Sequence, residues 1–276
     1  MTISEADFDL CRQLVEKYTG IVLAKRNEYI VESRLKKIMR LESIDSIPTL
    51  LKLIRNDPKR SLVDNFVENF VNTETQFFRD RDFFRTLKTV VFPEIRDRLT
   101  TGQILNVWCA AASSGQEPYS VAIMLSEHFP DLAVGRVRLI GSDISQSILS
   151  RAREGTYKLI EVERGLDSGQ RDKYFEGRGD HWQISPRMRA QIEFRRINLI
   201  DDWPPLPLMD MILMRNVLLY FSDQTKKLII EKTKSQLKSG GYLFLGATEA
   251  PGVANGELER TRFGRTVCFR KKAVSR

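Results

Sequence analysis

The chain has 276 residues, 42% of them hydrophobic and 29% charged, so it is long enough for one large domain or two ordinary ones and has the composition to bury a core. No apolar run approaches the roughly 20 residues of a membrane helix, and the acid-bearing N-terminus does not resemble a secretory signal, so we expect a cytoplasmic protein. Three widely spaced cysteines and two histidines fit no disulfide framework, metal spacing or histidine-based triad, and the net charge of +8 favours an acidic partner.

Residues 1–72 are predicted to form an all-helical N-terminal domain. Its first helix begins at a capping box of Ser4 and Asp7 and ends at Gly20, as glycine commonly ends helices. Further helices are expected at about 27–41, 47–56 and 60–72.

The second of these helices carries a stripe of apolar residues, Val31, Leu35 and Ile38, spaced for one face. The opposite face and its flanks are basic: Arg26, Arg34, Lys37 and Arg40. One interpretation is an ordinary solvated face. The other is a cationic ridge that docks on an acidic helix.

The stretch TETQFFRDR, residues 73–81, connects the helical domain to the rest of the chain. One interpretation is a hinge whose phenylalanines pack against both domains and hold them together. The other is a segment whose Thr73, Thr75 and Arg79 face a ligand bound between the domains. A helix over about 82–98 is expected to follow.

The stretch ILNVWCAAASSGQEPYS, residues 104–120, reads as a strand, a tight turn of small residues and a helix with Pro118 in its first turn. In an open α/β sheet such a turn lies at the carboxyl end of the strand, where ligands bind. A packed turn without a chemical role is the alternative.

The composition of this turn restricts the ligand. The glycine fingerprint of dinucleotide folds and the phosphate-loop Gly-Lys-Ser/Thr are both absent, and the turn carries a carboxylate, Glu117. That carboxylate would repel a phosphate but suit a cation. S-adenosylmethionine has a sulfonium, an ammonium and no phosphate, so it fits best.

Polar residues also follow two further predicted strands. Asp143 ends the strand at 137–140 and is placed to bind a ribose hydroxyl pair, or else to cap the helix at 146–154. Arg215 and Asn216 follow the buried strand 209–214 and point to the same crevice. Alternatively, Arg215 pairs with an acid and Asn216 starts a turn.

A small antiparallel β insertion is expected at about 173–194, and a helix capped by Ser222 or Asp223 runs to Leu237. A buried strand at 242–245 and a final antiparallel edge strand at 266–270 complete the chain. The predicted fold is α/β: a Rossmann-like domain over 73–276 that binds S-adenosylmethionine follows the helical domain.

Several segments together resemble the CheR family of chemotaxis receptor glutamate methyltransferases, in the expected order and over nearly the whole chain. They are TETQFFRD, VWCAAASSGQEPYS, GSDIS, INL, RNVLLYF and LKSGGYLFLG. The resemblance implies transfer of a methyl group from S-adenosylmethionine to glutamates of chemoreceptor cytoplasmic helices, with S-adenosylhomocysteine as product.

The resemblance also implies the site. Arg79 and Tyr220 would be catalytic. The implied cofactor contacts are Thr73, Thr75, Arg79, Glu117, Asp143, Asn198, Leu199, Arg215 and Asn216. Two features depart from the family: Thr73 stands where other members have Asn, and the hairpin around 177–188 is shorter than in members that bind a receptor tail peptide.

A glutamate substrate is already ionised at neutral pH, so the reaction needs neither a general base nor a metal. We expect a monomer that docks receptors through Arg26, Arg34, Lys37 and Arg40, needs no receptor C-terminal pentapeptide and binds no nucleic acid. Three alternatives stay open at this point: a methyltransferase for nucleic acid or small molecules, a non-enzymatic S-adenosylmethionine sensor, and, with least support, a nicotinamide-dependent oxidoreductase.

Overall fold

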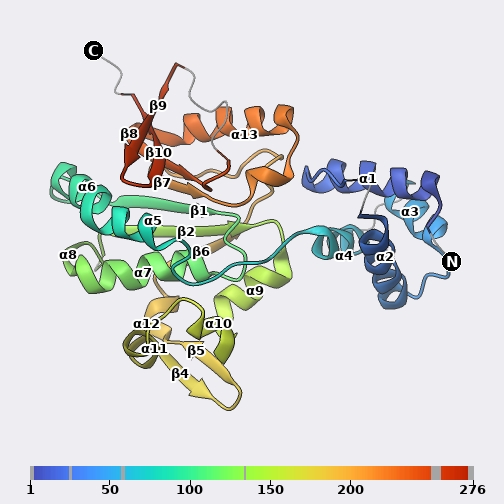
Figure 1. Cartoon of the computed structure of the whole chain (residues 1–276), viewed down its shortest axis with the longest axis horizontal. Helices are drawn as coiled ribbons and strands as arrows, with labels where there is room; N and C mark the ends of the chain where they lie inside the picture. Colours follow the sequence, from blue (N-terminus) through green and yellow to red (C-terminus); the bar gives the residue numbers. More distant parts are fainter. Residues whose placement is uncertain (1–2, 25–26, 57–59, 134, 250–255, 273–276) are drawn as a thin grey trace.

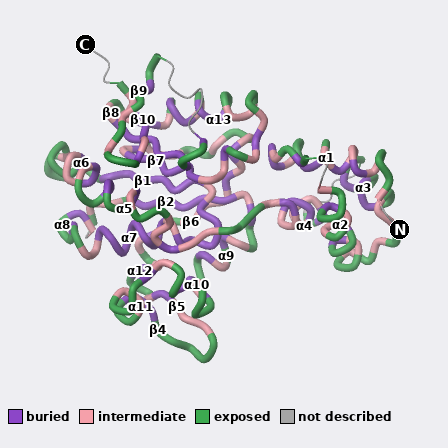
Figure 2. The backbone as a smooth tube through the Cα atoms, viewed as in Figure 1, coloured by how far each residue is buried: buried purple, intermediate pink, exposed green. Residues whose placement is uncertain are grey.

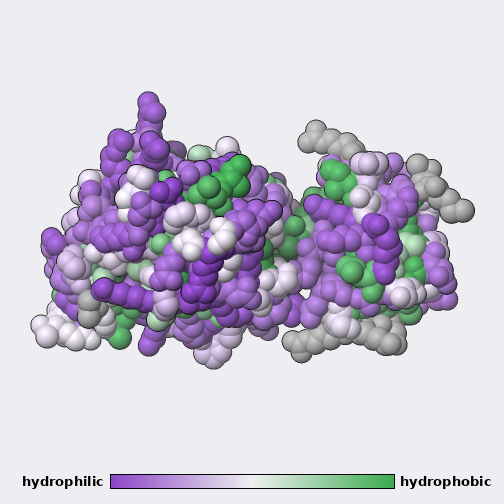
Figure 3. Space-filling model, turned by 90° about the horizontal axis from the view of Figure 1, so that it is seen from below, coloured by the Kyte–Doolittle hydropathy of each residue, from purple (hydrophilic) through white to green (hydrophobic). Residues whose placement is uncertain are grey.

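The computed structural model describes residues 3–24, 27–56, 60–133, 135–249 and 256–272. A group of N-terminal helices lies beside a larger α/β body, and a small second sheet projects from that body (Figure 1). Seen from below, the helical part and the body form two lobes that meet at a waist (Figure 3). Among the described residues, no helix has the length and apolar character needed to span a bilayer.

The N-terminal helices pack around a core of their own, formed by residues such as Val15, Leu35 and Phe66. The helices are α1 (Glu5–Thr19), α2 (Glu28–Glu42), α3 (Ile47–Asn56) and α4 (Arg60–Phe70). The predicted ends of α1 are confirmed: the Ser4 hydroxyl accepts a hydrogen bond from the backbone N–H of Asp7, and Gly20 adopts φ +74°.

The body is built on a mostly parallel sheet, which confirms the predicted α/β class. In the part of the chain that the structure describes, seven strands follow the order β6-β2-β1-β7-β8-β10-β9. They are β1 (Leu105–Ala110), β2 (Val137–Asp143), β6 (Ile192–Arg196), β7 (Met209–Met214), β8 (Leu237–Leu245), β9 (Leu258–Phe263) and β10 (Thr266–Lys271). Every residue of the central strand β1 is buried (Figure 2).

Helices cover both faces of this sheet (Figure 1). Val107 and Cys109 of β1 pack with α5 and α7, whereas Trp108 and Ala110 face the cluster that includes α13. The covering helices are α5 (Arg81–Thr86), α6 (Phe92–Arg98), α7 (Gln116–His128), α8 (Pro130–Ala133), α9 (Gln146–Glu154) and α13 (Asp223–Gln236). A π-helical turn, η2 (Leu87–Val91), joins α5 to α6, so the helix expected at 82–98 is one nearly continuous helical run.

The small antiparallel sheet exists, but its predicted limits of 173–194 are wrong. Its strands are β3 (Thr156–Lys158), β4 (Phe175–Arg178) and β5 (His181–Ile184), in the order β3-β5-β4, accompanied by α10 (Leu159–Glu163), α11 (Ser168–Tyr174) and α12 (Pro186–Arg189). Residues 192–196 instead form β6, parallel to β2. There Phe194 lies against Gly141, whose missing Cβ leaves room for the ring, and against Tyr119.

The strand predicted at 266–270 is antiparallel, as expected, but it does not lie at the edge of the sheet. β10 pairs antiparallel with β8, as expected, but β9 continues the sheet beyond it. The sheet edge on this side is therefore β9, a strand whose three charged residues, Glu259, Arg260 and Arg262, gave no apolar signal.

The helical part contacts the body through α4 and through the segment after α1. Asp64 of α4 forms an ion pair with Arg196 of β6. Glu68, one helical turn later, accepts hydrogen bonds from the Ser145 and Ser147 hydroxyls and from the backbone N–H of Ser147 (3.0 Å). These contacts bring the helices against the carboxyl ends of β2 and β6.

Candidate functional site

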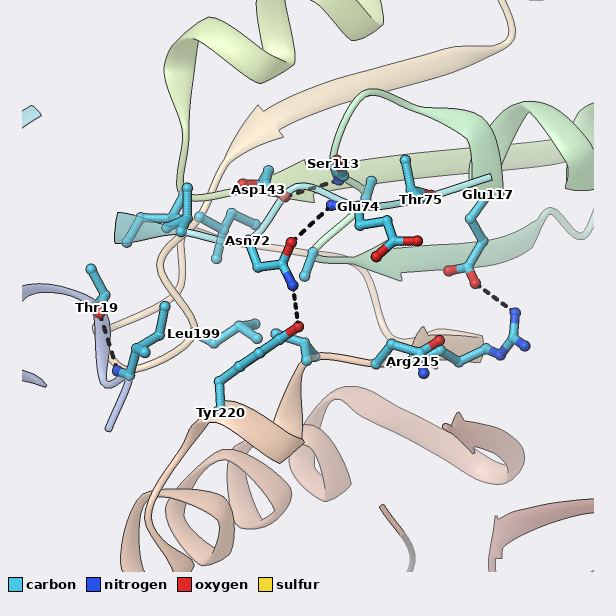
Figure 4. A pocket seen from close by; sticks show the side chains of 18 of the residues that line it. Thr19, Asn72, Glu74, Thr75, Ser113, Glu117, Asp143, Leu199, Arg215 and Tyr220 are labelled. Carbon is cyan, nitrogen blue, oxygen red and sulfur yellow. Dashed lines mark hydrogen bonds and ion pairs between the residues drawn. The ribbon is translucent and has the colours of Figure 1, made fainter. Parts of the chain in front are cut away.

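A cavity of about 950 Å³, its open mouth included, lies at the carboxyl ends of β1, β2 and β7 (Figure 4). The carboxyl ends of the strands are where ligands bind in open α/β sheets. Its walls also include the linker after α4 and the segment after α1, so both the helical part and the body enclose it.

The turn between β1 and α7 lines the floor of the cavity with small residues, Ala111, Ala112 and Ser113. Ala111, Ser113 and Gly115 all have positive φ values, of 57°, 50° and 92°. A Cβ on Gly115 would lie only 3.0 Å from the Tyr119 ring, so this position requires glycine. The Ser113 hydroxyl donates to the carbonyl of Thr73 (2.7 Å), which draws the linker over the turn.

Asp143 is 8% exposed, and its two carboxylate oxygens accept the backbone N–H groups of Ser113 (2.9 Å) and Ser145 (3.0 Å). It does not cap α9, because the side chain of Ser145 does so. Burial raises the pKa of Asp143, and these backbone hydrogen bonds oppose that rise. An ionised carboxylate can accept more than one hydrogen bond at each oxygen, which suits a ribose hydroxyl pair.

Glu117 stands in the first turn of α7, and its Oε2 accepts a hydrogen bond from Arg215 (2.9 Å). Its other oxygen, Oε1, has no partner among the described residues. Burial raises the pKa of Glu117, and the nearby guanidinium groups of Arg215 and Arg79 oppose the rise. The result is a partly desolvated carboxylate that a ligand cation would stabilise.

Arg215 is 9% exposed and uses its guanidinium within the protein. The group lies 3.9 Å from the centre of the Phe83 ring and donates to Glu117, to Asp80 (3.4 Å) and to the carbonyl of Arg79 (3.1 Å). Arg215 therefore pairs with acids, as the alternative interpretation held. It also lines the cavity and fixes the Arg79–Asp80 turn.

The segment after β7 is held by Glu249, a residue that sequence reasoning missed. Glu249 is 6% exposed, and its carboxylate accepts the backbone N–H groups of Asn216 (2.7 Å), Leu219 (3.2 Å) and Gly246 (2.5 Å). This arrangement supports Asn216, which adopts φ 61°, and the short 3-10 turn η3 (Leu218–Tyr220) that follows. A single acid after a strand carries no pattern that would have revealed it.

Tyr220 is held by residues of the helical part. Its hydroxyl accepts a hydrogen bond from the side-chain amide of Asn72 (2.5 Å), and its backbone carbonyl accepts one from Val22 (2.9 Å) (Figure 4). Asn72 was expected within the last N-terminal helix, but α4 ends at Phe70 and Asn72 lines the cavity.

Most residues that the sequence singled out meet at this cavity. It is lined by Thr75, Arg79, Glu117, Asp143, Asn198, Leu199, Arg215, Asn216 and Tyr220. Thr73 is an exception: it is exposed, does not line the cavity, and contributes its carbonyl to Ser113. Asn198 also binds the carbonyl of Tyr18 (3.0 Å), so it joins the helical part to the cavity wall.

The four basic residues of the predicted ridge differ in their surroundings. Lys37 and Arg40 are exposed on α2. Arg34 is half-buried: its guanidinium lies 5.7 Å from the centre of the Phe70 ring and donates to the Phe70 carbonyl (3.4 Å). Burial lowers the pKa of Arg34. Arg26 lies outside the described residues.

The cavity fits S-adenosylmethionine by its donor and acceptor set. Asp143 suits a ribose, Glu117 suits a cation, and the floor of small residues lets a flat base approach the backbone. Among the described residues, no group of three or more His, Cys, Asp or Glu side chains is arranged to hold a metal ion.

Comparison with known proteins agrees with this site. The family model described as CheR methyltransferase, SAM binding domain, matches residues 73–265, and the one described as CheR methyltransferase, all-alpha domain, matches residues 6–71. The chain is 38% identical to chemotaxis protein methyltransferase Cher2 of Pseudomonas putida and 39% identical to chemotaxis protein methyltransferase 1 of Pseudomonas aeruginosa, in each case over 91% of this chain and 92% of the relative. It is 32% identical to the chemotaxis protein methyltransferase of Vibrio parahaemolyticus over 99% of both chains. With its cavity built from the matched segments of both models, the chain belongs to the CheR methyltransferase family.

Proposed function

We propose that this protein transfers a methyl group from S-adenosylmethionine to glutamate side chains on the cytoplasmic helices of chemoreceptors, forming methyl esters in chemotactic adaptation. The observation that carries the proposal is one cavity lined by two chemically different kinds of groups. Asp143 and Glu117 supply acids for a cationic nucleoside, while Arg79 and Tyr220 supply donors for a carboxylate.

S-adenosylmethionine supplies an electrophilic methyl group on its sulfonium. Asp143 accepts hydrogen bonds from the ribose hydroxyls, and Glu117, oriented by Arg215, pairs with the ligand cation. The nucleophile is the ionised carboxylate of the substrate, so the reaction requires neither a general base nor a metal. Catalysis then comes from alignment and from excluding water at the reacting oxygen.

Arg79 and Tyr220 orient the substrate carboxylate. Both line the cavity, and Arg79 is close enough to Glu117 to influence its pKa. A tight ion pair would make the carboxylate a poorer nucleophile, so these donors hold one oxygen while the other attacks. Thr75, Asn198, Leu199 and Asn216 complete the wall around the cofactor, and Thr73 contributes through its backbone.

The receptor docks on the helical domain. Lys37 and Arg40 present positive charge on α2, which steers an acidic helical target and sets its register. Arg34 supports that surface by packing on Phe70, and Arg26, expected from the sequence to share this face, lies outside the described residues. Docking of this kind suits a cytoplasmic monomer that binds no nucleic acid.

Recognition does not require a receptor C-terminal pentapeptide. The hairpin of β4 and β5 consists of four-residue strands joined directly through Gly179 and Asp180, which leaves little loop to hold a peptide. Calorimetric titration with a receptor tail pentapeptide should give no heat of binding, and a measurable affinity would overturn tail independence.

The test of the function uses tritiated S-adenosylmethionine and receptor-containing membranes. We expect label in the receptor band and release of volatile methanol on mild base treatment, because methyl esters hydrolyse in base. The Tyr220→Phe variant serves as the control for transfer at this site. Label that resists base, or that enters added oligonucleotide instead, would contradict glutamate methylation and favour the nucleic-acid alternative.

A further inference from the structure

Asn72 occupies a position between the two domains and uses both ends of its side-chain amide. Its Oδ1 accepts the backbone N–H of Glu74 (3.1 Å), and its Nδ2 donates to the hydroxyl oxygen of Tyr220 (2.5 Å) (Figure 4). Tyr220 lies 148 residues further along the chain, so this contact joins the end of the helical domain directly to the proposed catalytic residue.

The contact with Glu74 fixes which way the amide points. A backbone N–H requires an acceptor, so the oxygen of the Asn72 side chain must face Glu74 and its nitrogen must face Tyr220. An amide nitrogen donates and does not accept. The oxygen of Tyr220 therefore accepts this hydrogen bond, and the hydroxyl proton of Tyr220 stays free for another partner.

The backbone of Tyr220 is fixed as well. Val22 donates to its carbonyl, and Glu249 accepts the N–H of the preceding residue, Leu219. With the backbone and the hydroxyl oxygen both held, the phenol proton is the remaining free part of the residue, and Tyr220 lines the cavity. A donor on the phenol oxygen also polarises the O–H bond and makes it a stronger donor.

We propose that Asn72 is a positioning residue that makes the Tyr220 hydroxyl an obligatory hydrogen-bond donor to the substrate carboxylate. This inference rests on the proposed function, in which Tyr220 orients that carboxylate. It assigns a part in catalysis to a residue of the interdomain linker that the family resemblance did not include.

Two substitutions separate this role from a structural one. Asn72→Asp keeps an acceptor for Glu74 but replaces the donor with a carboxylate oxygen, which captures the Tyr220 proton. Asn72→Ala removes both hydrogen bonds and leaves the hydroxyl free to turn. We expect Asn72→Asp to lower kcat by more than about 10-fold, and Asn72→Ala by about 2- to 10-fold, following the strengths of charged and neutral hydrogen bonds. A purely structural linker residue gives the reverse order, because Asn72→Asp preserves the contact with Glu74.

The matched control for added charge is Asn69→Asp, in α4, whose side chain donates to the Asn65 carbonyl and does not line the cavity. Its kcat should stay within about twofold of the unmodified protein. Calorimetry with S-adenosylhomocysteine should show undiminished affinity in all three variants, which separates an effect on the substrate carboxylate from loss of the cofactor.

Repeating both Asn72 substitutions in the Tyr220→Phe background completes the test. Because Phe has no hydroxyl proton, we expect the two substitutions to differ by less than about twofold there. If Tyr220→Phe itself keeps full activity, the role of Tyr220 in the proposed function fails. If Tyr220→Phe is impaired but Asn72→Asp is no worse than Asn72→Ala in the unmodified background, only the inference about Asn72 is overturned.

Discussion

At the scale of single residues, Asp143 supports the turns around it and is the residue proposed to bind the ribose. Substitution Asp143→Ala removes a charge-assisted hydrogen bond to the ribose, so the affinity for S-adenosylhomocysteine should fall by about 1.5–3 kcal/mol. It also leaves the N–H groups of Ser113 and Ser145 without acceptors, so thermal unfolding must be measured alongside calorimetry. Unchanged affinity in a folded Asp143→Ala variant would remove Asp143 from the cofactor site.

The raised pKa values of Glu117 and Asp143 predict a pH dependence of cofactor binding. In both, burial favours the neutral form, so the stability they contribute is present at low pH and is lost as the pH rises through the raised pKa. A bound cation and ribose stabilise the ionised forms. Binding therefore releases protons, and affinity falls on acidification, beginning above the ordinary glutamate value of 4.5.

Calorimetry with S-adenosylhomocysteine at several pH values, in buffers that differ in ionisation enthalpy, measures both the affinity and the proton release. In Glu117→Gln the part of the dependence that comes from Glu117 should disappear, leaving that of Asp143. A pH-independent affinity from the ordinary glutamate value of 4.5 up to neutral pH, with no proton release, would show that neither carboxyl titrates on binding.

At the scale of helices and strands, the sequence predicts what local chemistry determines. The 3.6-residue period of α2 and the caps of α1 depend on residues a few positions apart, and both were predicted correctly. Strand pairing depends on partners that are distant in the sequence, so the sequence alone could not assign Ile192–Arg196 to the central sheet. Asn72 and Glu249 act through hydrogen bonds to residues that are distant in the sequence, and such contacts leave no periodic signal.

Lys37 and Arg40 are the exposed basic residues of the predicted docking face of α2, so the docking prediction is tested at these two positions. The double variant Lys37→Glu with Arg40→Glu should raise the KM for receptor at low salt while leaving the affinity for S-adenosylhomocysteine unchanged, because exposed charges act mainly on encounter and are screened by salt. Arg34 is left intact because reversing its charge would break its packing on Phe70.

The control for this surface is Lys52→Glu with Arg55→Glu on α3, which changes the net charge equally and alters two other exposed residues of the same domain. Its effect on the KM for receptor should be much smaller. Equal effects of the two double variants would indicate a general charge effect and would argue against a docking ridge on α2.

At the scale of the whole molecule, the cavity belongs to both domains. The body supplies Glu117 and Asp143 from the strand ends, whereas the helical part and its linker supply Asn72 and the hydrogen bond from Val22 to Tyr220. In the proposed function, a receptor helix that docks on the helical part is thereby joined, through a few short contacts, to the groups that align its glutamate. Under that proposal, the contact between the domains is part of the catalytic arrangement.

Glu68 of α4 makes several polar contacts in that junction. It accepts hydrogen bonds from the Ser145 and Ser147 hydroxyls and from the N–H of Ser147, next to the strand end that carries Asp143. The neighbouring ion pair of Asp64 with Arg196 is partly exposed on both sides, and such a pair contributes about 0–1 kcal/mol. The several charge-assisted bonds of Glu68 contribute more.

The substitution Glu68→Ala should therefore loosen the helical part from the body, and Asp64→Ala should do so much less. We expect faster proteolysis within the linker at 71–80 and a lower kcat, because Asn72 and Val22 would no longer hold Tyr220 in place. The affinity for S-adenosylhomocysteine should not fall, since the charge of Glu68 contributes to the raised pKa of Asp143 and its removal favours the ionised carboxylate. Unchanged linker proteolysis and kcat in Glu68→Ala would mean that packing around Ile21 and Phe221 holds the domains together without α4.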